Sequence, residues 1–529
     1  YGNCYPCPGF GGSLGWSGDN GSYGHAGDFK HCSSNQHYSQ YRNHFALCQL
    51  WGDLGLVSAG GNGAGALCQP PKGKVGSVSL QKQRNSPIYR KAHKIISDRF
   101  CLERFIRGVY DLNGIRVTGG IPLDGEVRIQ GSKNAALPVM AAALLIKGTT
   151  VLLGCPKIAD VMLMGQLLEK LGAKVRWQGN TLIIETKELT CCQADACLGE
   201  KMRSSIVLLG SLLGRCGKAR VPYPGGCVIG ARPIDLHLKA LNSLGASFRE
   251  EEGMLIGETS GLRGADISFP KASVGATQNA VLGAVCAKGS TVIQGGSVEP
   301  EVTWLCRFLK KAGADIIGEG TGCVRIRGVE RLHDTVFKVP SDRIAAGTYV
   351  CASAITRGTG VLLDAPVEEM GALLRAYEKI GGQYTRKSGT LVADSKNVQH
   401  AVPYVETEEY PGFPTDLQSL YLAAAMTLEG KSCICENVFE DRLRTAEELQ
   451  KMGGTLQICG KWLTAEKSRL HGAEVVSQDL RGGAALVSAA LAAEGFSTIR
   501  QTELIERGYE RFPETLRELG AKIIVEKEI

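Results

Sequence analysis

Apolar and polar positions recur in a fixed order from Ile115 onward. A nearly all-apolar helix ends at a glycine, a short β-rich run follows, and then come a helix with one apolar stripe, a second glycine and another strand. We count six such copies, because the glycines that end the second helix recur every 67 to 73 residues. The pattern predicts that these glycines, and those that end the first helices, adopt the left-handed conformation. The second-helix glycines are Gly172, Gly245, Gly313, Gly381, Gly453 and Gly520, and the first-helix glycines are Gly148, Gly217, Gly289, Gly358, Gly430 and Gly495.

The two helices of each copy have different apolar patterns. The first helices, such as Ala135 to Ile146 and Ala484 to Ala493, are apolar nearly all round and are predicted to be buried. In four copies the second helix has apolar residues at i, i+3, i+7 and i+10, which predicts one face against a core. These stripes are Val161/Met164/Leu168/Leu171, Val302/Leu305/Leu309/Ala312, Met370/Leu373/Tyr377/Ile380 and Tyr509/Phe512/Leu516/Leu519.

Six copies of about 70 residues exceed one ordinary hydrophobic core, so we expect two domains of three copies each. The first domain covers residues 133–340, and the second combines residues 113–132 with residues 341–529. Residues 1–112 have no sustained apolar period and form an extension of unassigned structure. Because the first methionine is Met140, we also consider that the start is misassigned and that synthesis begins at Val109 or Leu112.

Composition narrows the class of protein. The chain has 529 residues, is 43% hydrophobic and has a mean hydropathy of −0.04. It contains neither a run of about 18 apolar residues nor a signal peptide, so we expect a cytoplasmic protein that does not enter a membrane. A net charge of +7 suits small anionic substrates but is too weak to indicate nucleic-acid binding.

The cysteines do not predict a disulfide framework or a metal centre. Nineteen cysteines are scattered without paired spacings, which favours reduced thiols. Cys4 and Cys7 have a metal-like spacing, but no second pair follows at a zinc-finger distance. We therefore predict no metal site.

Polar residues gather where the buried helices begin. Free N–H groups and the positive end of the helix dipole make such starts suitable for phosphate or carboxylate. If the six starts meet at one place, the sequence predicts a binding site for an anion. The alternative is structural, in which Asp342 and Asp416 only cap helices while Lys133 and Arg203 are solvated. The residues at the starts are Lys133 and Asn134, Arg203, Ser273 and Gly275, Asp342 and Arg343, Asp416, and Arg481.

One cysteine lies in a loop that is suited to chemistry. Pro224, Gly225 and Gly226 predict a tight turn before Cys227, and Arg232 follows five residues later. Positive charge near a thiol favours the thiolate. The alternative is an unreactive cysteine beside a turn.

Long motifs in this order closely resemble those of the bacterial UDP-N-acetylglucosamine enolpyruvyl transferase family, from about Ile115 to Lys527. They are Gly131 to Pro138, the Cys227 loop, Ser273 to Thr277, Phe413 to Asp416, and Glu506 to Glu510. The resemblance implies a two-domain inside-out α/β barrel built from six βαβαββ-like repeats. It also implies the first committed step of peptidoglycan synthesis, with no cofactor.

The implied reaction moves the enolpyruvyl group of phosphoenolpyruvate onto the 3-hydroxyl of UDP-N-acetylglucosamine and releases phosphate. By resemblance, Cys227 is the proton donor, which also bonds covalently to phosphoenolpyruvate, and Asp416 lies beside the attacking hydroxyl. The cationic groups around phosphate and carboxylate are Lys133, Arg203, Arg232 and Arg507, joined by Asn134. The residues that the resemblance assigns to the nucleotide sugar are Arg232, Pro233, Ile234, Asp235, Leu236, Lys271, Ser273, Val274, Asp416 and Val438, with Arg442 and Asp342 as further candidates.

The sequence departs from the family's pattern at two positions, and two functions other than the implied reaction are considered. Val298 and Ala159 stand where members of the family often have a basic residue, which affects expected substrate affinity more than reaction type. One rival is the related enolpyruvyl transferase that takes shikimate phosphate, and the Cys227 loop with the stretch from Pro233 to Leu236 argues against it. The other is a catalytically silent relative that only binds the nucleotide sugar.

Overall fold

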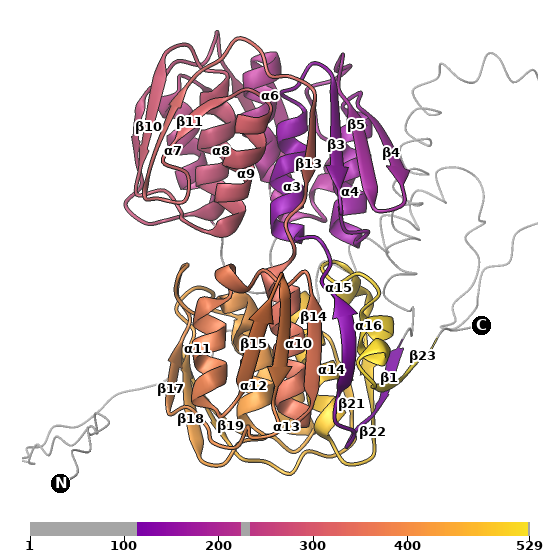
Figure 1. Ribbon diagram of the computed structural model, residues 1–529. Coiled ribbons are helices and arrows are strands. Elements are labelled where there is room, and N and C mark those ends of the chain that lie inside the picture. The colour runs from indigo at the N-terminus through magenta and orange to yellow at the C-terminus, as the bar shows by residue number, and fades with distance from the viewer. Residues whose placement is uncertain (1–113, 224–232, 527–529) are drawn as a thin grey trace, which may run out of the picture. The chain divides into compact units, whose positions relative to one another are not determined.

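The computed structural model describes residues 114–223 and 233–526, all of which belong to one compact unit (Figure 1). The predicted extension, Cys227 and Arg232 lie outside the described residues. Two hydrophobic clusters organise the described chain. One runs from Ala136 to Val339, and we call this part the first lobe; the other joins residues 115–129 to residues 344–523, and we call it the second lobe.

The elements follow the six-copy order. First-lobe elements are α3 (Lys133–Ala143), β3 (Thr149–Leu153), α4 (Ala159–Lys170), β4 (Lys174–Gln178), β5 (Thr181–Glu185), α5 (Ala196–Gly199), the 3-10 helix η1 (Arg203–Val207), α6 (Leu208–Cys216), β6 (Lys218–Pro222), α7 (Asp235–Ser243), β7 (Ser247–Glu251), β8 (Met254–Glu258), β9 (Asp266–Ser268), α8 (Val274–Val285), β10 (Ser290–Gln294), α9 (Pro300–Lys311), β11 (Asp315–Ile317), β12 (Cys323–Arg327) and β13 (Thr335–Lys338). Second-lobe elements are β1 (Gly114–Thr118), β2 (Asp124–Arg128), α10 (Arg343–Thr356), β14 (Thr359–Leu363), η2 (Val367–Glu369), α11 (Gly371–Lys379), β15 (Gln383–Lys387), β16 (Thr390–Asp394), β17 (Tyr404–Glu406), η3 (Thr415–Leu417), α12 (Gln418–Ala425), β18 (Lys431–Cys435), η4 (Arg442–Arg444), α13 (Thr445–Lys451), β19 (Thr455–Cys459), β20 (Trp462–Glu466), β21 (Glu474–Val476), α14 (Leu480–Ala492), β22 (Phe496–Arg500), α15 (Glu503–Glu506), α16 (Phe512–Glu518) and β23 (Lys522–Glu526).

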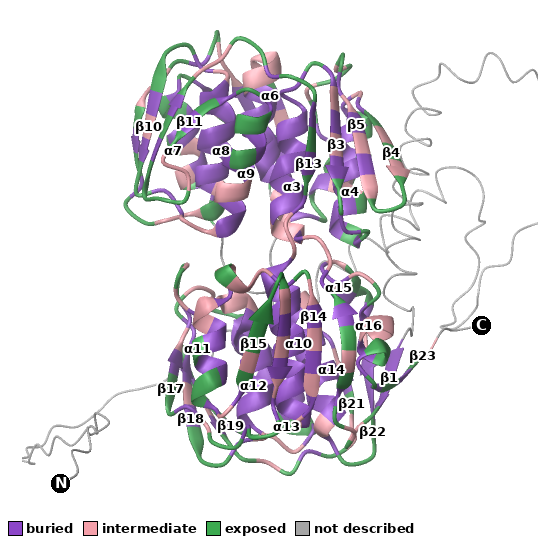
Figure 2. Cartoon of the chain, viewed as in Figure 1, coloured by how far each residue is buried: buried purple, intermediate pink, exposed green. Residues whose placement is uncertain are grey.

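Three central helices fill each lobe, and they are the first helices of the repeats. In the second lobe α10, α12 and α14 pack on one another, and in the first lobe α8 and α3 both contact α6. Their residues are almost entirely buried, as Figure 2 shows for α10 and α14. The four predicted stripes on the second helices are also buried. The apolar pattern therefore predicted the buried faces of both kinds of helix, although Tyr509 lies before α16 and not within it.

The repeats form six small sheets, which confirms the predicted α/β class with six copies. The third copy shows the plan. Strand β9 leads through α8 to β10, which pairs with it in parallel, and β12 and β11 then add in antiparallel order. A parallel pair needs a long crossover, and the buried helix provides it.

Three strands belong to a different repeat from the one that their sequence order suggests. Strand β13 pairs with β3 of the first copy, and β2 pairs with β14 of the fourth copy. Strand β1 lies between β22 and β23, so the earliest described strand completes the last sheet.

The chain passes between the lobes twice, and the two connections are bonded together. Gly131 and Ser341 form an antiparallel bridge. On either side, Ser132 N donates to the carbonyl of Pro340 at 2.7 Å, and Asp342 N donates to the carbonyl of Gln130 at 2.9 Å. These bonds fix the starts of α3 and α10 beside each other.

The predicted glycine ends are confirmed for the second helices and partly wrong for the first. All six second-helix glycines have positive φ, as do four of the first-helix glycines. Gly148 and Gly358 do not. In the fourth copy Arg357 takes the left-handed conformation instead, with φ 58°. Glycine is needed at these two positions for close approach: a Cβ on Gly148 would lie 1.7 Å from Asp334 Oδ1, and one on Gly358 would lie 1.9 Å from the carbonyl oxygen of Leu123.

Among the described residues, no helix combines the length and the apolar character that a bilayer-spanning segment requires. The same residues contain no group of three or more His, Cys, Asp or Glu side chains that could hold a metal ion.

Candidate active site

Lys133 lies at the junction of the two lobes. It is the first residue of α3, and Ser132 caps the helix by accepting a hydrogen bond from Ala135 N at 3.3 Å. The backbone N–H of Lys133 donates to Asp342 Oδ2 at 3.2 Å. Asp342 also accepts from the N–H groups of Ile344 and Ala345, so it caps α10 as the structural alternative expected. One helix start from each lobe, that of α3 and that of α10, therefore meets at Asp342.

Asp160 joins the two predicted catalytic cations. Its Oδ2 lies 2.7 Å from Lys133 Nζ, and its Oδ1 accepts from Arg507 Nε at 2.9 Å. Asp160 and Lys133 belong to the first lobe, whereas Arg507 follows α15 in the second lobe. The Asp160 side chain is 4% exposed. One buried carboxylate thus holds a lysine and an arginine whose positive charges suit a phosphate or carboxylate ligand.

Gln130 fixes the segment that carries Arg507. Its amide nitrogen donates to the carbonyl of Gly508 at 3.0 Å, and its amide oxygen accepts from Glu510 N at 2.7 Å. Because Gln130 lies in one of the two connections between the lobes, the position of Arg507 depends on that connection.

Charge balance in this cluster depends on Asp160. Burial lowers the pKa of Lys133, and the positive charges of Arg481 and Arg507 lower it further, while Asp160 raises it. Burial alone would raise the pKa of Asp160, but Lys133 and Arg507 together hold that pKa below its ordinary value. Asp160 therefore helps to keep the lysine charged at neutral pH.

Asp416 is held by two arginines. Its Oδ1 accepts from Arg442 Nη1 and Nη2, each at 2.9 Å, and its Oδ2 lies 3.4 Å from Arg481 Nη2. It sits inside η3, and its side chain makes no capping bond to that helix. The alternative in which Asp416 only caps a helix is therefore wrong.

Arg442 and Arg481 determine the protonation state of Asp416. Burial would raise its pKa, but Arg442 and Arg481 hold the pKa well below the ordinary range, with a further contribution from Lys133. A carboxylate in this state is ionised and a weak base, so it acts first as a hydrogen-bond acceptor. Arg442 Nε and Arg481 Nε and Nη1 are buried and find no hydrogen-bond partner in the described part of the chain. Unpaired buried donors of this kind suit an anionic ligand.

Val438 lies in a turn beside the same cluster. Its N–H donates to Glu436 Oε1 at 2.9 Å, and the hydroxyl of Thr415 donates to the same carboxylate at 3.0 Å. Glu436 is buried and so ties the Val438 turn to the residue before Asp416.

The remaining predicted residues lie mostly at helix starts in the first lobe. Ser273 caps α8, accepting from Ala276 N at 3.4 Å, and Ile234 is a core residue whose side chain is not available to a ligand. The others are exposed or half-buried: Asn134 on α3, Arg203 at the start of η1, Pro233 and Lys271 in loops, Asp235 and Leu236 in the first turn of α7, and Val274 at the start of α8.

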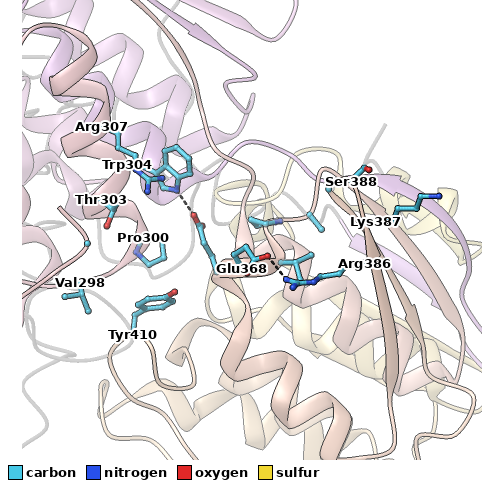
Figure 3. A pocket seen from close by; sticks show the side chains of 16 residues that line it. Val298, Pro300, Thr303, Trp304, Arg307, Glu368, Arg386, Lys387, Ser388 and Tyr410 are labelled. Atoms are coloured by element: carbon cyan, nitrogen blue, oxygen red, sulfur yellow. Dashed lines mark hydrogen bonds and ion pairs between the residues drawn. The ribbon is translucent and has the colours of Figure 1, made fainter. Parts of the chain in front are cut away.

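A cavity of about 780 Å³ lies elsewhere between the two lobes (Figure 3). Its walls include Val298, Pro300, Trp304 and Tyr410, and Trp304 Nε1 donates to Glu369 Oε1 at 2.7 Å across it. None of the predicted catalytic residues within the described chain lines this cavity. We call Lys133, Asp160, Asp416, Arg442, Arg481 and Arg507 the Lys133–Asp416 cluster, and none of them lines this cavity.

The prediction from sequence missed part of this cluster. Asp160 was not selected, because an acidic residue in the first turn of a helix is common for helix stability alone. Arg481 was noted as a helix start but not as a site residue. Its signal was present, since it begins a buried helix just as Lys133 does.

Comparison with known proteins shows the family of this chain. The family profile of EPSP synthase (3-phosphoshikimate 1-carboxyvinyltransferase) matches residues 117–516. A UDP-N-acetylglucosamine 1-carboxyvinyltransferase from Koribacter versatilis is 42% identical over 414 residues, which cover 77% of this chain and 95% of that protein. The protein named UDP-N-acetylglucosamine 1-carboxyvinyltransferase 2 from Caldanaerobacter subterraneus is 39% identical over 410 residues, which cover 77% of this chain and 98% of the relative.

Solved structures show the same fold. The enolpyruvyl transferase NikO from Streptomyces tendae superposes with a TM-score of 0.72 at 24% identity, covering 79% of this chain and all of the other. EPSP synthase from Acinetobacter baumannii gives a TM-score of 0.61 at 20% identity, covering 78% of this chain and 100% of the other. The predicted enolpyruvyl transferase fold is thereby confirmed.

Proposed function

Because this chain belongs to the EPSP synthase family of carboxyvinyl transferases, we propose that it transfers the enolpyruvyl group of phosphoenolpyruvate to the 3-hydroxyl of UDP-N-acetylglucosamine. Phosphate is released, and the product enters peptidoglycan synthesis. The observation that carries this proposal is the identity of about 40% to UDP-N-acetylglucosamine 1-carboxyvinyltransferases over nearly their whole length. The Lys133–Asp416 cluster supports it, since its excess of cations suits two anionic substrates.

We assign roles to the cluster as follows. Lys133 and Arg507 bind the phosphate and carboxylate of phosphoenolpyruvate, where an arginine offers bidentate geometry. Asp416 accepts the hydrogen bond of the sugar hydroxyl and takes its proton once substrate draws Arg442 and Arg481 away from it. Addition forms a C–O bond to the central carbon while Cys227 protonates the methylene carbon. Elimination then breaks the C–O bond to phosphate and returns a proton from the new methyl group to the Cys227 thiolate, which restores the double bond, and the proton taken by Asp416 leaves with phosphate.

The second reacting group is Cys227, which we propose as the acid that protonates the methylene carbon. Fosfomycin, a phosphonate epoxide, inhibits enzymes of the UDP-N-acetylglucosamine enolpyruvyl transferase family, which this chain resembles, through the equivalent cysteine. We expect peptide mapping after fosfomycin treatment to find the adduct on Cys227, forming faster when UDP-N-acetylglucosamine is present. Cys227→Asp should lose the adduct and keep measurable transfer. An adduct mainly on other cysteines would remove Cys227 from the mechanism.

Acceptor specificity is tested by phosphate release from phosphoenolpyruvate with each acceptor separately. We expect release with UDP-N-acetylglucosamine and none with shikimate 3-phosphate. Release with only the latter would support the shikimate-phosphate rival. Binding of the nucleotide sugar without release from either would support the silent relative.

The domain division and location also belong to this proposal. Two separate hydrophobic clusters support a first domain at 133–340 and a second domain that combines 113–132 with 341–529. Both substrates of the proposed reaction are intracellular metabolites in such a pathway, so we propose a cytoplasmic location.

A further inference from the structure

The first lobe contains a buried polar side chain that the proposed mechanism does not use. Asn279 lies in the middle of α8 and is fully buried. Most residues of α8 are apolar, and burying an amide costs free energy unless all of its hydrogen bonds are made. A fully buried asparagine in such a helix therefore calls for an explanation.

Asn279 bonds to three other elements. Its Oδ1 accepts from Gly210 N in α6 at 2.8 Å. Its Nδ2 donates to the carbonyl of Ile206 in η1 at 3.0 Å and lies 2.8 Å from His237 Nδ1 in α7. The two hydrogens of the amide nitrogen are thus both engaged. The close approach depends on Gly210, where a Cβ would lie 2.6 Å from the carbonyl oxygen of Asn279.

Two of these elements, η1 and α7, and α8 itself carry first-lobe residues that we assign to substrate. Arg203 begins η1, Asp235 and Leu236 begin α7, and Ser273 caps α8. Asn279 is therefore bonded to two elements whose first turn presents a candidate ligand group and lies on a third, while its own side chain is closed to solvent. The first turn of α3, with Lys133 and Asn134, is not bonded to it.

The bond to His237 also fixes the proton on that ring. Because both hydrogens of the Asn279 amide are donated, Nδ1 of His237 accepts, and the proton of the neutral ring is on Nε2. Burial, together with the positive charge of Arg203 in η1, lowers the pKa of His237 to about 4, although Asp235 on its own helix raises it. The Nε2 edge lies against the first turn of α8, where a Cβ on Gly275 would be 3.1 Å from it.

We propose that Asn279 is a positioning residue for the nucleotide-sugar subsite, which sets the relative placement of the first turns of α7 and α8 through one amide. This inference rests on the proposed function. Asn279 does not touch substrate; it acts through Asp235 and Ser273. A conformational error of about 1 Å at such groups can reduce rate about 100-fold.

The test compares Asn279→Asp with a matched control. An aspartate keeps the acceptor for Gly210 N but cannot donate to Ile206 or to His237. We expect KM for UDP-N-acetylglucosamine to rise at least about tenfold more than KM for phosphoenolpyruvate. The added carboxylate should also raise the pKa of His237, so that the sugar-nucleotide KM becomes dependent on pH between about 5 and 8. Ser488→Ala, which removes a buried hydrogen bond on α14 in the other lobe, should change neither quantity.

A second measurement uses the unmodified sequence alone. Nitrogen-15 NMR of full-length protein labelled at histidine and asparagine, with the His237 signal assigned by its through-space contact with the Asn279 side-chain amide, reports which ring nitrogen carries the proton. We expect Nε2 at pH 7. A proton on Nδ1, or KM values and a pH profile of Asn279→Asp equal to those of Ser488→Ala, would overturn the inference. If unmodified protein releases no phosphate with either acceptor, the proposed function fails instead, and the NMR result still judges the hydrogen bond.

Discussion

Asp160 occupies the position that an anionic substrate group would be expected to take. It neutralises part of the charge of Lys133 and Arg507, and its side chain is closed to solvent. An anion that binds there competes with Asp160 for both cations. The same carboxylate raises the pKa of Lys133 against the effect of burial. Binding and protonation at this site are therefore linked through one residue.

Replacing Asp160 should shift the pH dependence of catalysis. Asp160→Asn removes the charge that raises the pKa of Lys133, so this pKa falls further below its ordinary value and the lysine loses its proton at a lower pH. We expect the alkaline limb of the kcat/KM profile for phosphoenolpyruvate to move to lower pH, measured between pH 6 and about 10.

A matched control is available in Asp364→Asn. Asp364 also pairs with an arginine, Arg128, but its side chain is 43% exposed and it lies outside the Lys133–Asp416 cluster. The pH profile of kcat/KM for Asp364→Asn should match that of the unmodified protein. An Asp160→Asn profile that also matches would show that Asp160 does not control the charge of Lys133.

Replacing Asp416 tests whether this residue takes the proton of the sugar hydroxyl. Asp416→Asn keeps the size of the side chain but removes the charge that pairs with Arg442 and Arg481. Since the proton of the sugar hydroxyl then has no acceptor of sufficient basicity, we expect turnover to fall about 100-fold or more. Steady-state phosphate release measures this, with thermal unfolding to verify folding. Near-normal turnover by a folded variant would exclude Asp416 from proton transfer.

At the scale of elements, the sequence predicted helices better than connections. The starts at Lys133, Arg203 and Asp342 are where polar residues adjoin apolar periods, and such local signals need no knowledge of distant residues. The bond between Asp160 and Arg507 spans 347 positions along the chain and has no local signal. The apolar pattern predicts that Gly148 is a left-handed helix end. Its actual role is close approach to Asp334, and a local pattern does not reveal such a tertiary contact.

The buried position of strand β1 predicts how far the chain can be shortened at its N-terminus. Its residues Ile115 and Val117 are buried between β22 and β23, and they are the first described residues of either hydrophobic cluster. A chain that begins at Leu112 should therefore keep full phosphate release and an unchanged thermal midpoint. A chain that begins at Gly120 lacks β1, which leaves β23 unpaired and one edge of β22 open, and should unfold at a lower temperature or aggregate. Loss of activity in the longer chain would move the predicted boundary.

At the scale of the whole described molecule, a buried acidic group near α10 links the two lobes. Arg343 Nη2 lies 2.5 Å from Glu299 Oε2, and Arg343 Nε donates to Glu301 Oε1 at 3.1 Å. Glu299 also accepts from Tyr410 N at 3.2 Å. Burial raises the pKa of Glu299 to about 7, against the lowering effect of Arg343 and with the help of Glu301.

The raised pKa of Glu299 makes the stability of the protein depend on pH. Between the ordinary value of 4.5 and about 7, the folded protein holds a proton on Glu299 that the unfolded chain has lost. Stability should therefore fall as pH rises through this window. Glu299→Gln removes the titrating group and should flatten the dependence of the thermal midpoint on pH between 5 and about 7. Glu258→Gln, at an exposed site, serves as the control. Equal slopes in both variants would contradict the assignment.

The exchange of strands between repeats has a consequence for the order of synthesis. The first lobe runs without interruption from α3 to β13, so every strand of its three sheets is synthesised before α10 begins. Strand β1 is made early, yet both of its neighbours, β22 and β23, are among the last strands to emerge. Vectorial folding should therefore complete the first lobe while β1 still waits unpaired, and a ribosome that stalls late in translation would leave that strand as the exposed edge that chaperones must cover.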